Sequence, residues 1–88
     1  MKFLLLAYDS THEAMAADAA LAEAGFCDYA IIPRPSSISS RCGLALRIPW
    51  QHARRAIEIL RAAECMGTPY ASPDGQHWQP LRDLDLPA

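Results

Sequence analysis

The residues in this sequence most capable of chemistry are its three cysteines, and Cys42 stands out among them. It lies in the polar segment Ser39-Ser40-Arg41-Cys42-Gly43, where the following glycine leaves the sulfur unshielded. The thiolate is the reactive form of cysteine, and positive charge or a helix N-terminus favours it. Cys42 is therefore the best candidate for a nucleophile or a group carrier. The alternative is that Cys42 is a small, inert residue at the start of a strand.

Groups that could stabilise a thiolate or another anion at Cys42 come from two parts of the chain. A helix is predicted to begin at the capping sequence Ser10-Thr11-His12-Glu13, and its first amides carry partial positive charge. His12 could also take a proton, although a solvated first-turn histidine is the simpler interpretation. The polar loop before Gly43 supplies the remaining groups. The candidate anion-stabilising residues are Ser10, Thr11, His12, Arg34, Ser39, Ser40, Arg41 and Gly43.

The other two cysteines are weaker candidates. Cys65 precedes Met66-Gly67 at the end of a predicted helix, where the carbonyl dipoles disfavour a thiolate. We interpret Cys65 as a packed thiol, and the alternative is a resolving thiol that pairs with Cys42. Cys27 follows Phe26 ahead of a predicted strand and is expected to lie in the core.

Several other kinds of site lack the residues that they need. The sequence contains no C-x-x-C, H-x-x-x-H or H-E-x-x-H pattern, so no metal site is predicted. It also contains no glycine-rich phosphate loop, no G-x-S-x-G and no evident pair of catalytic carboxylates, and no cofactor is predicted. A thiol beside a helix N-terminus can carry a group without turning over a substrate. These patterns therefore favour a carrier over an enzyme.

Length and composition set further limits. The chain has 88 residues, 51% of them hydrophobic, with 8 Lys and Arg against 10 Asp and Glu. A domain of this size buries a modest core, which favours a homodimer or a docking partner. The charge balance argues against a nucleic-acid binder. Because the first apolar run stops at Tyr8-Asp9 and the thiols are unpaired, we expect no signal peptide, no membrane span and a cytoplasmic location.

The spacing of apolar residues predicts four strands and two helices. The predicted strands are Phe3–Ala7, Asp28–Ile32, Leu44–Ile48 and Tyr70–Ser72, and the predicted helices are Thr11–Ala24 and one that opens at Pro49 and stops at Gly67. The order β-α-β-β-α-β is typical of the α+β, ferredoxin-like split βαβ fold, with an antiparallel sheet and two helices on one face. Residues 1–72 would form this single domain. Residues 73–88 would form a C-terminal extension, a turn followed by a loosely ordered tail.

This topology places the candidate site. One end of the sheet is expected to gather the start of the first helix, the loop from Arg34 to Gly43 and the end of the second helix. Cys42 and Cys65 would share this end, and Cys27 would lie at the opposite end.

Three stretches of the sequence, taken together, point to a known family. They are Ser10–Ala14, Ile31–Pro35 and Ile38–Arg47, and they fall within roughly residues 3 to 66. In their order and spacing the sequence resembles the selenium/sulfur carrier protein-like domains, which occur beside or fused to TusA-like sulfur carriers. The sequence lacks the Cys-Pro-x-Pro of the TusA-like carriers themselves, so the mechanism of those carriers does not transfer directly.

The resemblance implies a role in moving sulfur or selenium. Cys42 would hold the chalcogen as a persulfide or selenosulfide, received from a donor protein such as a cysteine desulfurase and passed to an acceptor protein. Two alternatives stay open. A non-catalytic ligand- or protein-binding regulatory module would use Ser39, Ser40, Arg41 and the helix start, with Cys42 incidental. A thiol redox sensor would use Cys42 together with Cys65.

Overall fold

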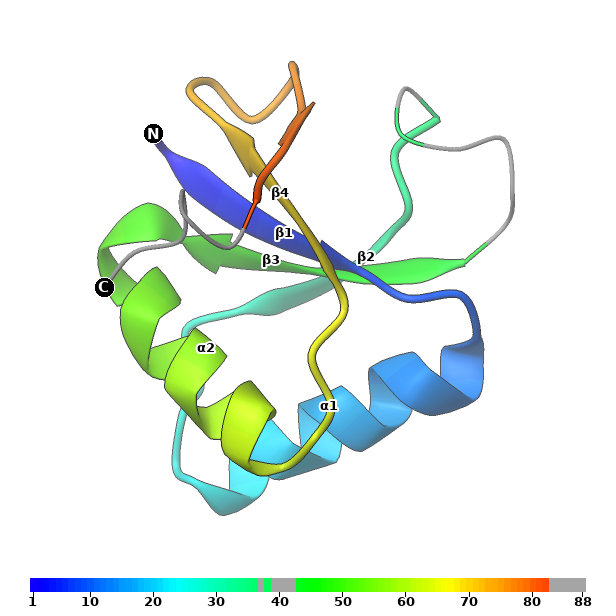
Figure 1. Ribbon diagram of the computed structural model, residues 1–88, viewed down its shortest axis with the longest axis vertical. Coiled ribbons are helices and arrows are strands. Elements are labelled where there is room, and N and C mark those ends of the chain that lie inside the picture. The colour runs from blue at the N-terminus through cyan, green and yellow to red at the C-terminus, as the bar shows by residue number, and fades with distance from the viewer. Residues whose placement is uncertain (37, 39–42, 83–88) are drawn as a thin grey trace.

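The computed structural model describes residues 1–36, 38 and 43–82. These residues form an α+β fold with a five-stranded sheet and two α-helices (Figure 1). In chain order the elements are β1 (Phe3–Ala7), α1 (Thr11–Glu23), β2 (Ala30–Pro33), β3 (Leu44–Pro49), a 3₁₀ turn (Trp50–His52), α2 (Ala53–Ala62), β4 (Thr68–Ser72) and β5 (Gln79–Pro80).

β1 occupies the centre of the sheet. The strand order is β2-β3-β1-β4-β5, and every neighbouring pair is antiparallel. β1 pairs with β3 along one edge and with β4 along the other, so that Leu5 lies opposite both Arg47 and Tyr70. The predicted α+β class, antiparallel sheet and two helices are confirmed.

A fifth strand extends the sheet beyond the four that the apolar pattern predicts. The turn signal Pro73-Asp74-Gly75 forms a tight connection, in which the Ser72 hydroxyl accepts hydrogen bonds from the amides of Asp74 and Gly75 at 3.2 and 2.7 Å. This turn directs the chain back along β4, where Gln79 pairs with Ala71. The two-residue strand β5 is too short to give a period-two signal, which is why the sequence pattern does not reveal it.

Both helices cover the same face of the sheet, as Figure 1 shows, and the core lies between these two layers. Leu4 and Leu6 of β1 belong to this core and have no exposed surface. Each such buried leucine stabilises the fold by roughly 1.5–3 kcal/mol. Small side chains line the helix surfaces that meet the sheet, and they allow close approach. The buried alanines of the helices are Ala14, Ala17, Ala53 and Ala56.

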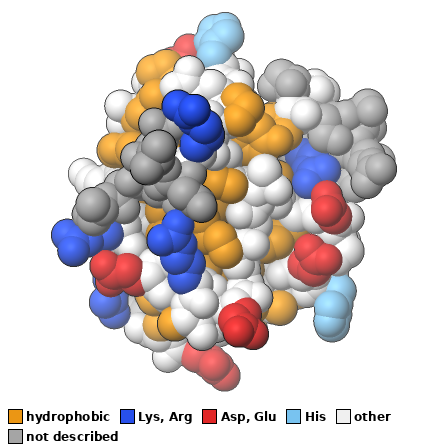
Figure 2. Space-filling view, viewed as in Figure 1, with side chains coloured by type: hydrophobic (Ala, Val, Ile, Leu, Met, Phe, Trp, Pro, Cys, Tyr) orange, Lys and Arg blue, Asp and Glu red, His pale blue; other side chains and the backbone are white. Residues whose placement is uncertain are grey.

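The surface mixes charges of both signs. Figure 2 shows Asp and Glu side chains interspersed with Lys and Arg on one face, with hydrophobic side chains between them. The mixed charges on this face agree with the small net charge of −2.

The two helices end in the same way but with different residues. Each is followed by a residue in the left-handed region, Gly25 after α1 (φ 77°) and Glu64 after α2 (φ 57°). In both helices the amide of the next residue donates to the carbonyl five positions earlier at 2.9 Å, which completes a Schellman cap. The first helix therefore ends within a residue of its predicted limit.

The prediction that Gly67 stops the second helix is wrong. Glu64 instead has the left-handed backbone conformation that follows the end of the helix. The capping hydrogen bonds form directly after Ala63, so the helix ends before the chain reaches Gly67. Gly67 has a different role: a Cβ at this position would lie 2.7 Å from the carbonyl oxygen of Ala7. The start of the helix also differs from the prediction, since Pro49 ends β3 and the 3₁₀ turn precedes α2.

We expect Glu64→Gly to stabilise the protein by roughly 0.5–1 kcal/mol, because relief of the left-handed strain exceeds the added entropy of the unfolded chain. The matched change, Gly25→Ala, should destabilise it by about 1 kcal/mol through the same conformational term, since a Cβ at Gly25 meets no atom within 4 Å. Urea unfolding followed by circular dichroism measures both. Loss of stability in Glu64→Gly would contradict this account of the second cap.

Candidate functional site

Three segments that are distant in the sequence meet at one end of the sheet. They are the connection from β1 into α1, the residues that flank the β2–β3 loop, and the turn between α2 and β4. Arg34 pairs with Asp9, and Tyr8 bonds to the backbone of Cys65, so each of the other two segments is tied to the β1–α1 connection. The predicted gathering of these segments is confirmed for the described residues.

The start of α1 has the predicted cap. The Ser10 hydroxyl accepts a hydrogen bond from the Glu13 amide at 3.2 Å, with Ser10 itself in an extended conformation. Thr11 and His12 follow in the first turn and are exposed to solvent. Free amides of the first helical turn carry partial positive charge, so this end of α1 favours a nearby anion.

Arg34 and Gly43 are held together where the β2–β3 loop leaves and re-enters the sheet. The Arg34 amide donates to the Gly43 carbonyl at 2.9 Å, which extends the pairing of β2 with β3 by one position. The Arg34 side chain is 7% exposed, and its Nη2 donates to Asp9 Oδ1 at 3.3 Å. Its Nε–H is buried and has no hydrogen-bond partner among the described residues. A fixed positive charge therefore lies beside Gly43.

Tyr8 joins β1 to the turn after α2. Its hydroxyl donates to the Cys65 carbonyl at 2.7 Å, and the side chain is almost fully buried. Burial raises the pKa of Tyr8 well above its ordinary value, so the phenol stays protonated and remains a donor. Gly67 packs against this ring, since a Cβ there would lie 2.9 Å from Tyr8 Cζ.

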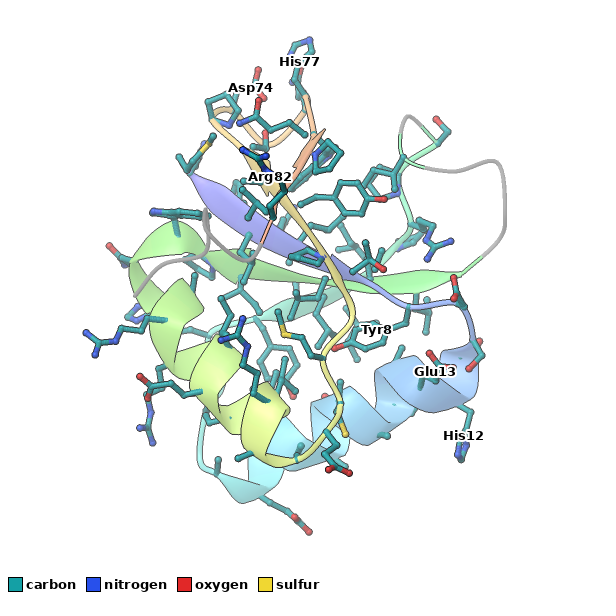
Figure 3. All side chains as sticks on the ribbon, in the orientation of Figure 1. Tyr8, His12, Glu13, Asp74, His77 and Arg82 are labelled. Carbon is teal, nitrogen blue, oxygen red and sulfur yellow. The ribbon has the colours of Figure 1, made fainter. Side chains whose placement is uncertain are left out.

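The Cys65 thiol lies beside a small pocket between α1 and the turn after α2. Its Sγ donates to the Ala63 carbonyl at 3.3 Å, and the residue is half-buried. The pocket has a volume of about 180 Å³. It is lined by Tyr8, His12, Glu13, Ala16, Glu64, Cys65 and Met66. Figure 3 shows Tyr8 beneath the chain that enters β4, with Glu13 and His12 on the first turns of α1.

Cys42, the principal site residue that the sequence predicts, is not among the described residues. Cys42, Ser39, Ser40 and Arg41 lie outside the described residues. Gly43, which follows Cys42 in the chain, is described, and so are the candidate residues Ser10, Thr11, His12, Arg34 and Cys65. The structure brings these described residues to the same end of the sheet.

The prediction that Cys27 lies in the core is wrong. Cys27 is exposed, because the chain passes over the end of α1 after Phe26 has entered the core. It lines surface pockets with residues of the opposite end of the sheet, among them Phe3 and Pro49. Cys27 is therefore separated from the candidate site, as the topology predicts.

The two histidines outside α1 pair with carboxylates elsewhere on the surface. His52 Nε2 lies 3.2 Å from Asp28 Oδ2. In the turn before β5, His77 Nδ1 lies 2.6 Å from Asp74 Oδ2, on the side of the molecule away from His12 (Figure 3). Hydrogen bonds from the backbone amides of His77 and Gln76 hold the pKa of Asp74 well below its usual range. This cluster stabilises the turn.

The described residues contain neither a metal-binding cluster nor a membrane-spanning helix. No group of three or more His, Cys, Asp or Glu side chains in this part of the chain is arranged to hold a metal ion. Among the same residues, no helix combines the length and apolar character that crossing a membrane requires.

Fold and sequence together define a small α+β protein, and a family model matches most of the chain. That model, described as "Putative Se/S carrier protein-like", matches residues 3–70. The chain belongs to this family, in agreement with the resemblance in its sequence motifs. No curated protein matches the chain. No solved structure matches it either.

Two residues that position this end of the sheet, Tyr8 and Asp9, are not among the site residues predicted from the sequence. Tyr8 continues the alternation of Leu4 and Leu6 into the core, and that spacing could have revealed it as a buried residue. Asp9 gave no comparable signal, because its pairing with Arg34 joins residues 25 positions apart. The pair forms only when the sheet brings the two segments together.

We expect Tyr8→Phe to destabilise the protein by about 1 kcal/mol, because the Cys65 carbonyl loses its donor. Tyr8 should also make the free energy of unfolding depend on pH in the alkaline range. Since the folded-state pKa of Tyr8 is raised above the unfolded value near 10, its contribution is complete below about pH 10 and is lost as the pH rises further.

Urea unfolding at about pH 8 and about pH 11 tests this dependence across the phenol titration. Tyr29→Phe is the control, because Tyr29 also has a pKa raised to about 12, by burial and by its hydrogen bond to Asp18. In Tyr29→Phe, the free energy of unfolding should still fall at alkaline pH by the amount that titration of Tyr8 causes. If the free energy of unfolding falls equally in wild type and in Tyr8→Phe, the assignment of this pH dependence to Tyr8 is refuted.

Proposed function

We propose that this protein carries sulfur or selenium on Cys42, as a persulfide or selenosulfide, between a donor protein and an acceptor protein. Membership of the Se/S carrier protein-like family is the observation that carries the proposal. The described surroundings of the loop support it, since Gly43 lies beside the Arg34 guanidinium at the sheet end where α1 begins. Such an environment favours a thiolate over a thiol.

The transfer needs no metal, oxidant or cofactor. The Cys42 thiolate attacks the terminal sulfur of a cysteine persulfide on the donor, a new S–S bond forms, and the donor cysteine leaves as a thiolate. The sulfur atom moves at the zero-valent level, so no net oxidation occurs. An acceptor thiolate then removes it by the same exchange, and Cys42 returns to its starting state. We propose a cysteine desulfurase as the donor and the cytoplasm as the location.

This role also fits the small α+β fold of the described residues. We propose that β1 to β4 with the two helices correspond to a ferredoxin-like core, to which β5 adds an outer strand. A carrier must present its cysteine to two different proteins in turn, and residues that connect two strands generally serve that purpose better than a closed cavity. We infer that this site docks partner proteins rather than turning over a substrate.

Intact-protein mass spectrometry tests the proposal. After incubation with a cysteine desulfurase and cysteine, and without reductant, the wild-type protein should gain the mass of one sulfur atom, and Cys42→Ser should gain none. The single variants Cys27→Ser and Cys65→Ser are matched controls that should load as the wild type does. Folding of each variant is checked by circular dichroism.

Loading that persists in Cys42→Ser would contradict the assignment of the carrier residue. A wild-type protein that does not load, and whose Cys42 also reacts slowly with iodoacetamide near neutral pH, would favour the binding-module alternative.

A further inference from the structure

β2 is the outermost strand on one side of the sheet, and no described strand pairs with its outer edge. The ladder with β3 shows which backbone groups face that edge. Arg34 N–H donates to the Gly43 carbonyl at 2.9 Å. Because hydrogen-bonded positions alternate along an antiparallel ladder, Ile32 also bonds to β3, and Ile31 directs its N–H and carbonyl outward. Strand edges of this kind readily pair with another strand.

Within residues 29–33, Ile31 alone offers both a donor and an acceptor to this edge. Pro33 has no N–H, and the Tyr29 amide donates to the Cys27 carbonyl at 3.0 Å. An antiparallel strand therefore gains two hydrogen bonds here only opposite Ile31. Two copies of β2 meet this condition when Ile31 of one lies opposite Ile31 of the other, since each residue then donates once and accepts once. The edge is complementary to itself.

An apolar surface adjoins this edge on the side of the helices. Ile31 lies opposite the core residue Leu46 in the ladder, yet its side chain is 40% exposed. Met15 lies on the same side of α1 as Ala22, seven positions later, and is 44% exposed. Between the helix and the strand runs an open groove of about 550 Å³. It is lined by Ala22, Gly25, Phe26, Cys27, Tyr29 and Ile31.

The exposure of these side chains indicates that the surface meets a partner. Ile31 and Met15 are two of the three large hydrophobic side chains that are exposed among the described residues. β2 itself, Ala30–Pro33, contains no charged residue, although natural edge strands are commonly protected by one. An apolar edge beside an apolar groove is typical of a protein interface.

The distribution of charge favours a second copy of the chain as this partner. Asp28 lies three positions before Ile31, and Arg34 lies three positions after it. In the register centred on Ile31, Asp28 of each copy therefore falls opposite Arg34 of the other. Each residue also has a partner in its own chain, His52 at 3.2 Å for Asp28 and Asp9 at 3.3 Å for Arg34. Opposite charges thus flank the paired strands at both ends.

We infer that two copies of this chain pair through the outer edges of β2, antiparallel and centred on Ile31, to form one continuous sheet across a twofold axis. The exposed side chains of Ile31 and Met15 become buried at this interface. Two backbone hydrogen bonds and a small apolar surface predict a dimer that dissociates in the micromolar range. The inference is independent of the carrier role, because it rests on residues outside the proposed carrier site.

Sedimentation velocity of the full-length chain, with reductant and from about 1 to about 200 µM, tests the association. The wild-type protein should change from monomer to dimer within this range. Ile31→Lys should weaken the association at least about a hundredfold, because it places two ammonium groups side by side across the twofold axis. Met1→Lys is the matched control. Met1 is 52% exposed and precedes β1, which β3 separates from β2, so this variant should associate as the wild type does.

A wild-type protein that stays monomeric up to about 200 µM would overturn the inference. So would a dimer that persists unchanged in Ile31→Lys, once circular dichroism shows that this variant is folded. Pairing of this edge with a strand of a different protein, while the chain alone stays monomeric, would also overturn the second copy as the occupant.

Disulfide cross-linking tests the register. Each new cysteine is introduced into a chain in which Cys27, Cys42 and Cys65 are replaced by serine. Ile31→Cys should form a cross-linked dimer under mild oxidation, because opposed residues in a hydrogen-bonded pair have Cα atoms about 5.5 Å apart. Pro33→Cys should not, since the two copies of that residue would be offset by four positions, roughly 13 Å. Equal cross-linking of the two variants would overturn the register.

Discussion

The structure depends on the burial of β1 from Leu4 to Ala7. Leu4, Leu5 and Leu6 have no exposed surface, and the strand is hydrogen-bonded to β3 on one edge and β4 on the other. Because both edges and both faces are covered, the register of three strands is fixed by one five-residue segment. The next residue, Tyr8, extends this constraint beyond the strand by donating to the Cys65 carbonyl. The geometry of the candidate site follows from this placement.

The positions just after β1 are consequently the most constrained part of the site. Asp9 meets Arg34, and Ser10 caps α1, within two residues of the buried Tyr8 phenol. The local chemistry is electrostatic: it comes from a helix N-terminus, where Ser10 caps α1, and from the Arg34 guanidinium, which pairs with Asp9. Such preorganised groups can stabilise an anion without moving. This suits the carrier role that we propose.

Much of this arrangement was predictable because the signals are local. The apolar run Phe3–Ala7 predicts the central strand, and the Ser10 cap predicts the start of α1 at the observed residue. Other features were not predictable, because they depend on tertiary contacts. Gly67 is of the residue type that often ends a helix, but here glycine is required because the Ala7 carbonyl approaches closely. Glu64 instead takes the left-handed conformation that glycine usually adopts. The exposure of Cys27 likewise follows from the path of the chain after Phe26.

The proposed role of Cys42 in carrying sulfur or selenium can be tested on the protein as cells make it. The most direct measurement is peptide mapping by mass spectrometry of the protein isolated from growing cells without reductant, with free and persulfide thiols alkylated at lysis. The account predicts that the peptide containing Cys42 bears one additional sulfur or selenium atom and that the peptides containing Cys27 and Cys65 bear none. Chalcogen found on Cys27 or Cys65 instead, or on none of the three, would contradict it.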